Sequence, residues 1–495
     1  MKKNILILSF LLIGFCGFAQ NDEALTRETV QKSTIKGHIY FLASDELRGR
    51  ETGSPEIDIA AKYLSTTFQR YGVAPVPGAT EGYFQEVPLV KTITPDAYSL
   101  KIGDRVVDPE GLLRLEGANI DTKAEIVFMN YGLEKDFEDK KLAGKIAVVL
   151  AGREDAQDWR SVFMESAAKS KRAKEAGALG LVELHTQSPD NWIQFKRFTG
   201  GSVVGIKREE ESSNSGFFNL WVKDYDSNFQ KAVSDKKKPL FEVLISKEMQ
   251  IEIPSKNVVG MVEGTDPELK NEYVIYSAHY DHIGVGKPNA EGDSIYNGAR
   301  DNAVGVVTVM SAAESIAKNP TKRSALFILF TAEEKGLLGS RYYTENPLLP
   351  LEQMVYCFNS DNGGYNDTSI ATIVGLGRTT AEKHIKEAAE TFGLTAIDDP
   401  AGEQGLFDRS DNVNFAKKGI PAPTFSLGFT AFDAEIGKYY HQQADNPETM
   451  DYDYLEKFFS AFVLSARLIA NDSETPFWTE GDKYYEAGKA LYNEN

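Results

Sequence analysis

Cysteine is nearly absent from this chain of 495 residues, which contains only Cys16 and Cys357. Cys16 lies in a segment with the charged start, the apolar run (residues 5–15) and the small residues near Ala19 that are typical of a secretory signal peptide. Phe15 directly before Cys16 favours cleavage near Ala19 over attachment of a lipid. Cleavage would leave one cysteine and therefore no intrachain disulfide. We expect an exported protein, periplasmic or extracellular, that depends on its core for stability.

Long apolar runs and an excess of positive charge are also missing. No segment after the leader has the roughly 20 apolar residues that a membrane-spanning helix needs. The 54 basic residues are outnumbered by 73 acidic ones, and losing Lys2 and Lys3 with the leader would take the formal charge from −19 to −21. Such a charge argues against nucleic acid or an anionic membrane surface as a partner.

The composition, 42% hydrophobic and 26% charged, is typical of a globular protein, and the length indicates two domains. Helix-like apolar spacing near the N-terminus gives way to short alternating runs around residue 90, and strands alternate with helices after Pro254. The stretch rich in short strands looks like a separate β-rich domain, and we read it as non-catalytic because its one histidine, His185, has no acid cluster beside it. We predict a signal peptide (1–19), a first segment of the larger domain (20–90), the inserted β-rich domain (91–253), the main part of the larger domain (254–475) and a helical tail (476–495).

The part after Pro254 predicts an α/β fold. Strands are expected at 273–277, 325–330, 354–358 and 423–427, and helices at 303–317, 379–392 and 452–469. This alternation indicates a mainly parallel, mixed sheet with helices on both faces.

Acidic residues and histidines follow the predicted strands where each one ends. His279 and Asp281 follow the first strand, Glu333 and Glu334 the second, and Asp361 the third. Carboxyl ends of parallel strands meet at one edge of a sheet, which is where ligands bind. Two further candidates are Asp301, which could alternatively cap a helix, and His441, which comes from a loop before the last helix. Histidine is scarce, with six residues, and His282 is expected to turn its side chain away from the site.

These residue types favour a metal site. Imidazole and carboxylate ligands without thiolate suit zinc, and manganese or cobalt as substitutes. The acids exceed what one ion needs, which indicates two ions that share a bridging carboxylate. Asp301 is the natural bridge, His279 and Asp361 would complete one site, and Glu334 and His441 the other. Glu333 is then free to act as a general base.

The same residues resemble the co-catalytic dizinc exopeptidases of clan MH, which include bacterial leucine aminopeptidases and glutamate carboxypeptidases. The segment at 42–54 is similar to the first segment of that family, and Ser410-Asp411 with 419–422 matches a further one. The stretches 142–150 and 173–180 resemble the protease-associated domain that many members carry as an insertion.

The resemblance implies a phosphorylase/hydrolase-like zinc exopeptidase fold, peptide substrates and specific roles for side chains around the metals. Glu333 would deprotonate the attacking water and pass the proton to the leaving amine. Asp281 would orient His279 through its second ring nitrogen, Asp445 would support His441, and Tyr440 would donate to the oxyanion or simply pack in its loop. It also implies a cis peptide after Asp301. An acidic site suits a cationic terminal amine, which favours an aminopeptidase.

Other functions share parts of this pattern. A dipeptidase or a carboxypeptidase of the same family would use the same ligands, and glutaminyl cyclases keep many of the motifs but are usually compact. Receptor-like relatives act as binding modules, and their ligands are eroded, whereas none is eroded in this chain. A serine hydrolase would need a Gly-x-Ser-x-Gly motif, but the nearest match, at 424–428, begins with Thr424. The sequence gives no prediction of the oligomeric state.

Overall fold

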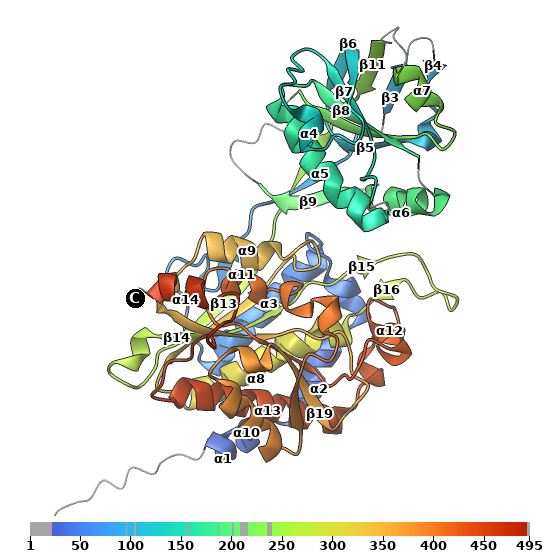
Figure 1. Cartoon of the computed structure of the whole chain (residues 1–495). Coiled ribbons are helices and arrows are strands. Elements are labelled where there is room, and N and C mark those ends of the chain that lie inside the picture. The colour runs from blue at the N-terminus through green and yellow to red at the C-terminus, as the bar shows by residue number, and fades with distance from the viewer. Residues whose placement is uncertain are drawn as a thin grey trace, which may run out of the picture. The chain divides into compact units, whose positions relative to one another are not determined.

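The computed structural model describes residues 22–95, 97–102, 105–155, 158–186, 188–199, 202–207, 216–234 and 240–492 (Figure 1). The predicted signal peptide lies outside the described residues. The chain forms two compact units, of which the larger joins the segment ending at Val87 to the segment that starts at Pro254, and the smaller comprises Pro88–Ile253. Among the described residues, no helix has the length and apolar character needed to cross a membrane.

An eight-stranded mixed sheet organises the larger unit, in the order β1-β13-β17-β14-β18-β21-β19-β20. The four central strands β17, β14, β18 and β21 run parallel, and antiparallel pairs join β1, β13 and β19 to the sheet. The predicted mixed α/β sheet is therefore confirmed. The strands are β1 (Phe84–Glu86), β13 (Lys256–Val262), β14 (Tyr273–His279), β17 (Ser324–Phe330), β18 (Met354–Ser360), β19 (Ile370–Val374), β20 (Thr395–Asp398) and β21 (Thr424–Leu427), with a small hairpin of β15 (Gly284–Val285) and β16 (Ile295–Tyr296).

Apolar side chains project from both faces of this sheet, because successive residues of a strand point to opposite sides. All seven residues of β17 are buried. Phe327 and Leu329 contribute to one hydrophobic core, while Leu326, Ile328 and Phe330 contribute to the other. Helices cover both faces, as Figure 1 shows. The first core includes α2 (Lys32–Leu42), α3 (Pro55–Tyr71), α8 (Gly305–Lys318), α10 (Glu382–Thr391) and α13 (Tyr452–Asn471), and the second includes α9 (Leu338–Glu345), α11 (Asn412–Ala416) and α14 (Tyr485–Tyr492).

Both ends of the described chain are anchored to this unit. Helix α1 (Asp22–Thr29) begins with Asp22, whose carboxylate accepts a hydrogen bond of 2.7 Å from Arg467 of α13. At the other end, Trp478 is 1% exposed and donates to the carbonyl of Gly419 at 2.8 Å. This buried tryptophan makes the tail part of the core.

The smaller unit is built around a second eight-stranded sheet, in the order β4-β3-β11-β6-β7-β8-β10-β5, with a separate three-stranded sheet of β12, β2 and β9. The longest helix of this unit, α5, begins at Trp159. His185 is buried and packs against Trp221 and Phe195. The elements are β2 (Leu89–Ile93), β3 (Tyr98–Ile102), β4 (Arg105–Val106), β5 (Leu112–Glu116), β6 (Ile120–Phe128), α4 (Glu134–Phe137), β7 (Ile146–Leu150), α5 (Trp159–Glu175), β8 (Gly180–His185), α6 (Pro189–Thr199), β9 (Val203–Ile206), β10 (Phe218–Lys223), α7 (Asn228–Ser234), β11 (Leu240–Ile245) and β12 (Met249–Ile253).

A buried histidine in α2 makes the stability of the larger unit depend on pH. His38 Nδ1 lies 2.6 Å from the hydroxyl of Tyr63, and Nε2 lies 2.9 Å from that of Tyr71. Burial, with a smaller contribution from the charge of Arg70, lowers the pKa of His38 to about 4. The unfolded chain therefore binds a proton between about pH 6.5 and 4 that the folded chain does not, so stability falls as the pH falls.

We expect the free energy of unfolding to drop by about 2 kcal/mol from this residue alone between pH 7 and pH 5. His38→Gln keeps a donor and an acceptor for the two tyrosines but does not titrate, so that part of the pH dependence should disappear. Denaturant unfolding of both proteins in excess chelator would measure it. Parallel pH profiles for the two proteins would show that His38 does not contribute.

Candidate metal centre

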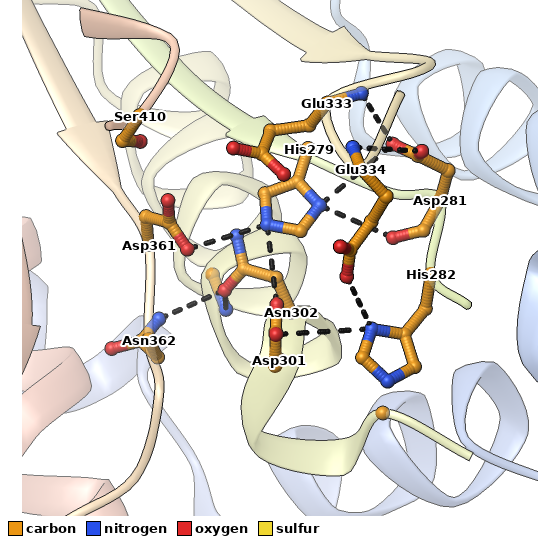
Figure 2. Close-up of polar contacts among 12 residues, drawn as sticks. His279, Asp281, His282, Asp301, Asn302, Glu333, Glu334, Asp361, Asn362 and Ser410 are labelled. Atoms are coloured by element: carbon orange, nitrogen blue, oxygen red, sulfur yellow. Dashed lines mark hydrogen bonds and ion pairs between the residues drawn. The ribbon is translucent and has the colours of Figure 1, made fainter. Parts of the chain in front are cut away.

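The acidic cluster lies where three neighbouring strands end. Strands β17, β14 and β18 are adjacent in the sheet. Glu333 and Glu334 follow β17, His279 is the last residue of β14, and Asp361 follows β18. The predicted meeting of three strand ends is therefore confirmed. Figure 2 shows these side chains turned toward one another.

Asp301 reaches the same place from the loop before α8. The peptide bond between Asp301 and Asn302 is cis, as expected. Asn302, not Asp301, binds the start of the helix, because its Oδ1 accepts a hydrogen bond from the N–H of Gly305 at 3.0 Å. The Nδ2 of Asn302 donates to the carbonyl of Ser360 at 2.9 Å. The carboxylate of Asp301 is thus available to the acidic cluster, and the capping alternative for Asp301 is wrong.

The two carboxylate oxygens of Asp301 face two different groups of side chains. Oδ1 lies 3.3 Å from Nε2 of His279, and that nitrogen also lies 3.3 Å from Oδ1 of Asp361. Oδ2 lies 3.0 Å from Nε2 of His441, which lies 3.6 Å from Oε2 of Glu334. All five residues expected to be ligands are therefore brought together, with Asp301 between the two groups.

His282 also belongs to this cluster, which corrects the expectation that it turns away. Its ring is fully buried, with Nδ1 2.8 Å from Oε1 of Glu334 and 3.8 Å from Oδ2 of Asp301 (Figure 2). The alternation of a strand does not apply to it, because β14 ends at His279. The presence of a second histidine three residues beyond the first was the signal in the sequence.

Asp281 holds the acidic pair through the main chain. Its carboxylate accepts from the N–H of Glu333 at 3.1 Å and of Glu334 at 3.4 Å, and from the hydroxyl of Thr52 at 2.9 Å. The ring of His279 instead uses the carbonyl oxygen of Asp281, 3.1 Å from Nδ1, whereas the carboxylate is 3.8 Å away. Asp281 therefore orients His279 through its main chain, and not through its carboxylate as expected.

Asp445 supports Asp301 rather than His441. Its carboxylate accepts from the main-chain N–H of Arg300 at 2.9 Å, from that of Asp301 at 3.2 Å and from the Arg300 guanidinium at 3.0 Å. Tyr440 is the residue that contacts His441, and their ring centroids lie 4.1 Å apart in a stacked arrangement. Asp445 was expected to support His441, but its carboxylate binds the main chain at Arg300 and Asp301 and the Arg300 guanidinium instead.

Burial and neighbouring charges shift the pKa values within the cluster. Burial alone would lower the pKa of His279, but the carboxylates of Glu333 and Asp361 outweigh it and raise that pKa well above its usual value. Burial, with the charges of Asp361 and Asp411, raises the pKa of Glu333 well above its usual range. For Asp301, the nearby His282, His279 and His441 outweigh burial and lower the pKa.

Such a concentration of buried carboxylates is costly unless cations compensate it. The donor atoms form two groups in which all atoms lie within 4.8 Å of one another, one of His279, Asp301 and Asp361 and the other of His282, Asp301 and Glu334. The donor set of imidazole nitrogens and carboxylate oxygens fits zinc, manganese or cobalt. The cluster can therefore hold divalent metal ions.

The cluster opens on a cavity of about 400 Å³. Glu333 and Glu334 lie at its acidic side, together with the metal-ligand candidates, and Tyr440 also lines it. The remaining walls include apolar side chains and one cation, Arg409. The apolar residues are Leu337, Val374, Leu406, Phe429, Phe432 and Ile436.

Comparison with known proteins agrees with this geometry. Residues 257–465 match the peptidase family described as Peptidase family M28. The chain is 25% identical over 337 residues to aminopeptidase YwaD of Bacillus subtilis, an alignment that covers 66% of this chain and 62% of that protein, which is less than two thirds of its length. It is 24% identical over 417 residues to the probable leucine aminopeptidase 2 of Aspergillus oryzae, covering 76% of this chain and 72% of the relative.

The fold is also found among solved structures. An aminopeptidase from Aneurinibacillus sp. strain AM-1 superimposes with a TM-score of 0.57 at 21% identity, and the match covers 92% of this chain and 97% of that one. The resemblance drawn from the sequence is therefore confirmed, and residues 257–465 are similar to the peptidases of family M28.

Proposed function

We propose that this protein is a zinc-dependent exopeptidase that removes amino acids from the amino end of peptides. The observation that carries the proposal is the position of Asp301, whose two oxygens face separate groups of metal ligands beside the carboxylate of Glu333. Bridging carboxylates of this kind are typical of two-metal hydrolase sites. The match of residues 257–465 to family M28 and the aminopeptidases among the similar proteins support the same activity.

The residues assigned to the metals are those that converge in the structure. His279, Asp301 and Asp361 would hold one zinc ion, and Asp301, Glu334 and His441 the other, with manganese or cobalt as substitutes. When bound, the metals supply Lewis acidity, which lowers the pKa of water and polarises a carbonyl oxygen.

Glu333 moves the proton in this mechanism. Its carboxylate lines the cavity, and burial raises its pKa well above the usual range, which makes it a stronger base than an ordinary glutamate. Glu333 takes the proton of the attacking water and then donates it to the nitrogen of the leaving amine. The carboxylate of Asp281 accepts a hydrogen bond from the main-chain N–H of Glu333, which fixes the position of the Glu333 backbone. Tyr440, on the cavity wall, donates to the substrate oxygen as negative charge develops there.

The amino end is favoured because the acidic side of the cavity complements a terminal ammonium group. The apolar walls would then receive the side chain of the first residue. Arg409 on the same cavity would instead attract a carboxylate, which favours a dipeptidase or carboxypeptidase as the second candidate. Peptides with a blocked amino end and peptides with an amidated carboxyl end separate the two activities.

The proposed setting is outside the cytoplasm. The charged and apolar residues at the N-terminus support export, and the order of strands and helices in Pro88–Ile253 supports a protease-associated domain inserted into the peptidase.

The activity can be tested with a library of short peptides with free amino ends. We expect release of the first amino acid, loss of at least about 90% of the rate after chelation, and recovery when zinc is added back to about two equivalents. Amino acid analysis of the products measures it. The aminopeptidase assignment would be wrong if amino-blocked peptides were cleaved as fast as free ones.

A further inference from the structure

His282 is a buried histidine that is not among the five proposed metal ligands. Its residue is 0% exposed, and neither ring nitrogen makes a hydrogen bond with another described residue. The Oε1 atom of Glu334, which faces it, also lacks a hydrogen bond. Two buried polar atoms left unsatisfied in contact with each other require a physical reason, because each costs free energy of about 1 to 3 kcal/mol.

The geometry of this contact supplies the reason. Nδ1 of His282 and Oε1 of Glu334 are 2.8 Å apart, yet they are not aligned as donor and acceptor. Two ligands of one tetrahedral zinc ion lie about 3.3 Å apart and point at the ion instead of at each other. The remaining spacings fit the same centre, since Oδ2 of Asp301 lies 3.8 Å from His282 and 3.0 Å from His441.

The ring of His282 is held in this position from behind. Its main-chain N–H donates to the carbonyl of Arg50 at 3.3 Å, and the Arg50 guanidinium binds the carbonyls of Tyr280 at 3.0 Å and of Gly298 at 3.1 Å. Gly298 leaves room for the imidazole, because a Cβ atom there would lie 2.7 Å from two carbons of the ring. The fold therefore presents the ring to Glu334 and Asp301, with its centroid 5.8 Å from that of the more exposed His441.

We propose that His282 is a further ligand of the second metal site, alongside Asp301, Glu334 and His441. The inference rests on the proposed metal centre and deepens it. It makes the two sites unequal, with one imidazole, from His279, in the first and two imidazoles in the second. Imidazole is a better ligand for zinc than carboxylate is, so the first zinc ion should bind at the second site.

Cobalt(II) titration of the full-length protein, followed by proton NMR, tests the assignment. Each histidine that binds cobalt gives hyperfine-shifted imidazole resonances, and we expect three such histidines in the wild type and two in His282→Phe, which keeps the ring volume without a donor. The first equivalent of cobalt should give resonances from two histidines. His384→Ala, which removes a histidine bonded to Asp472 elsewhere in the unit, should leave all three.

Zinc affinity provides the second measurement. His282→Phe should weaken one equivalent more than about 100-fold, beyond the 10- to 100-fold typical of residues that only support a ligand. If only two histidines of the wild type gave hyperfine-shifted resonances, the proposal would be overturned without any variant. His282 would then be a positioning residue for Glu334, and the dizinc site would stand. A wild-type protein that binds no cobalt would overturn the metal centre itself.

Discussion

Replacing Glu333 by glutamine should lower kcat by about 1,000-fold or more while the protein keeps both zinc ions. Glutamine preserves the size of the side chain and cannot take a proton, and loss of a general base typically costs between 100- and 10,000-fold in rate. The metal content should not change because none of the donor pairs that define the two groups involves Glu333. Steady-state kinetics and metal analysis of the same preparation measure both quantities.

The neighbouring residue provides the matched control. Glu334→Gln makes the same chemical change one position along the chain, in a carboxylate that contacts His282 and His441. This variant should lose about one equivalent of zinc, and adding zinc in excess should restore part of the rate. The division of roles would be refuted if Glu333→Gln lost metal and Glu334→Gln retained it.

The residues at strand ends could be predicted because the pattern that reveals them is local. An apolar run such as that of β17, followed at once by two acids, needs no tertiary information to be placed at the carboxyl edge of a parallel sheet. Strands β19 and β20 were harder to predict. They are short, at five and four residues, and they join the sheet through the pairing of β19 with β21, a strand much later in the chain, so little in the local pattern indicated them.

The direction of individual side chains depended on backbone conformations that the sequence does not indicate. Ala332, just before the acidic pair, has a φ of 56°, and His441 has a φ of 57°, both in the left-handed region that usually favours glycine. The roles of Asp281 and Asp445 were misassigned for a related reason. Their partners are main-chain N–H groups brought close by the fold, and a sequence motif records only side chains.

Changing Asp301 to alanine should remove both zinc ions. Its carboxylate is the one group that faces both sets of ligands, with Oδ1 toward His279 and Oδ2 toward His441. Without it, each set loses a charged ligand, and the remaining carboxylates lose the cations that balance their repulsion. We expect zinc content to fall from about two equivalents to fewer than about 0.2, with loss of activity that added zinc does not restore.

Asp361→Ala distinguishes a bridge from an ordinary ligand. Asp361 contacts His279 and belongs to only one of the two groups, so this variant should retain about one equivalent of zinc. Circular dichroism and thermal unfolding in chelator would show whether the loop around Asp301 still folds, since Asp445 and Asn302 hold it independently of the carboxylate. Equal zinc loss in the two variants would mean that the ions depend on each other for binding and that Asp301 is not the sole link. Retention of both ions in Asp301→Ala would exclude the bridge, because no other described carboxylate belongs to both groups.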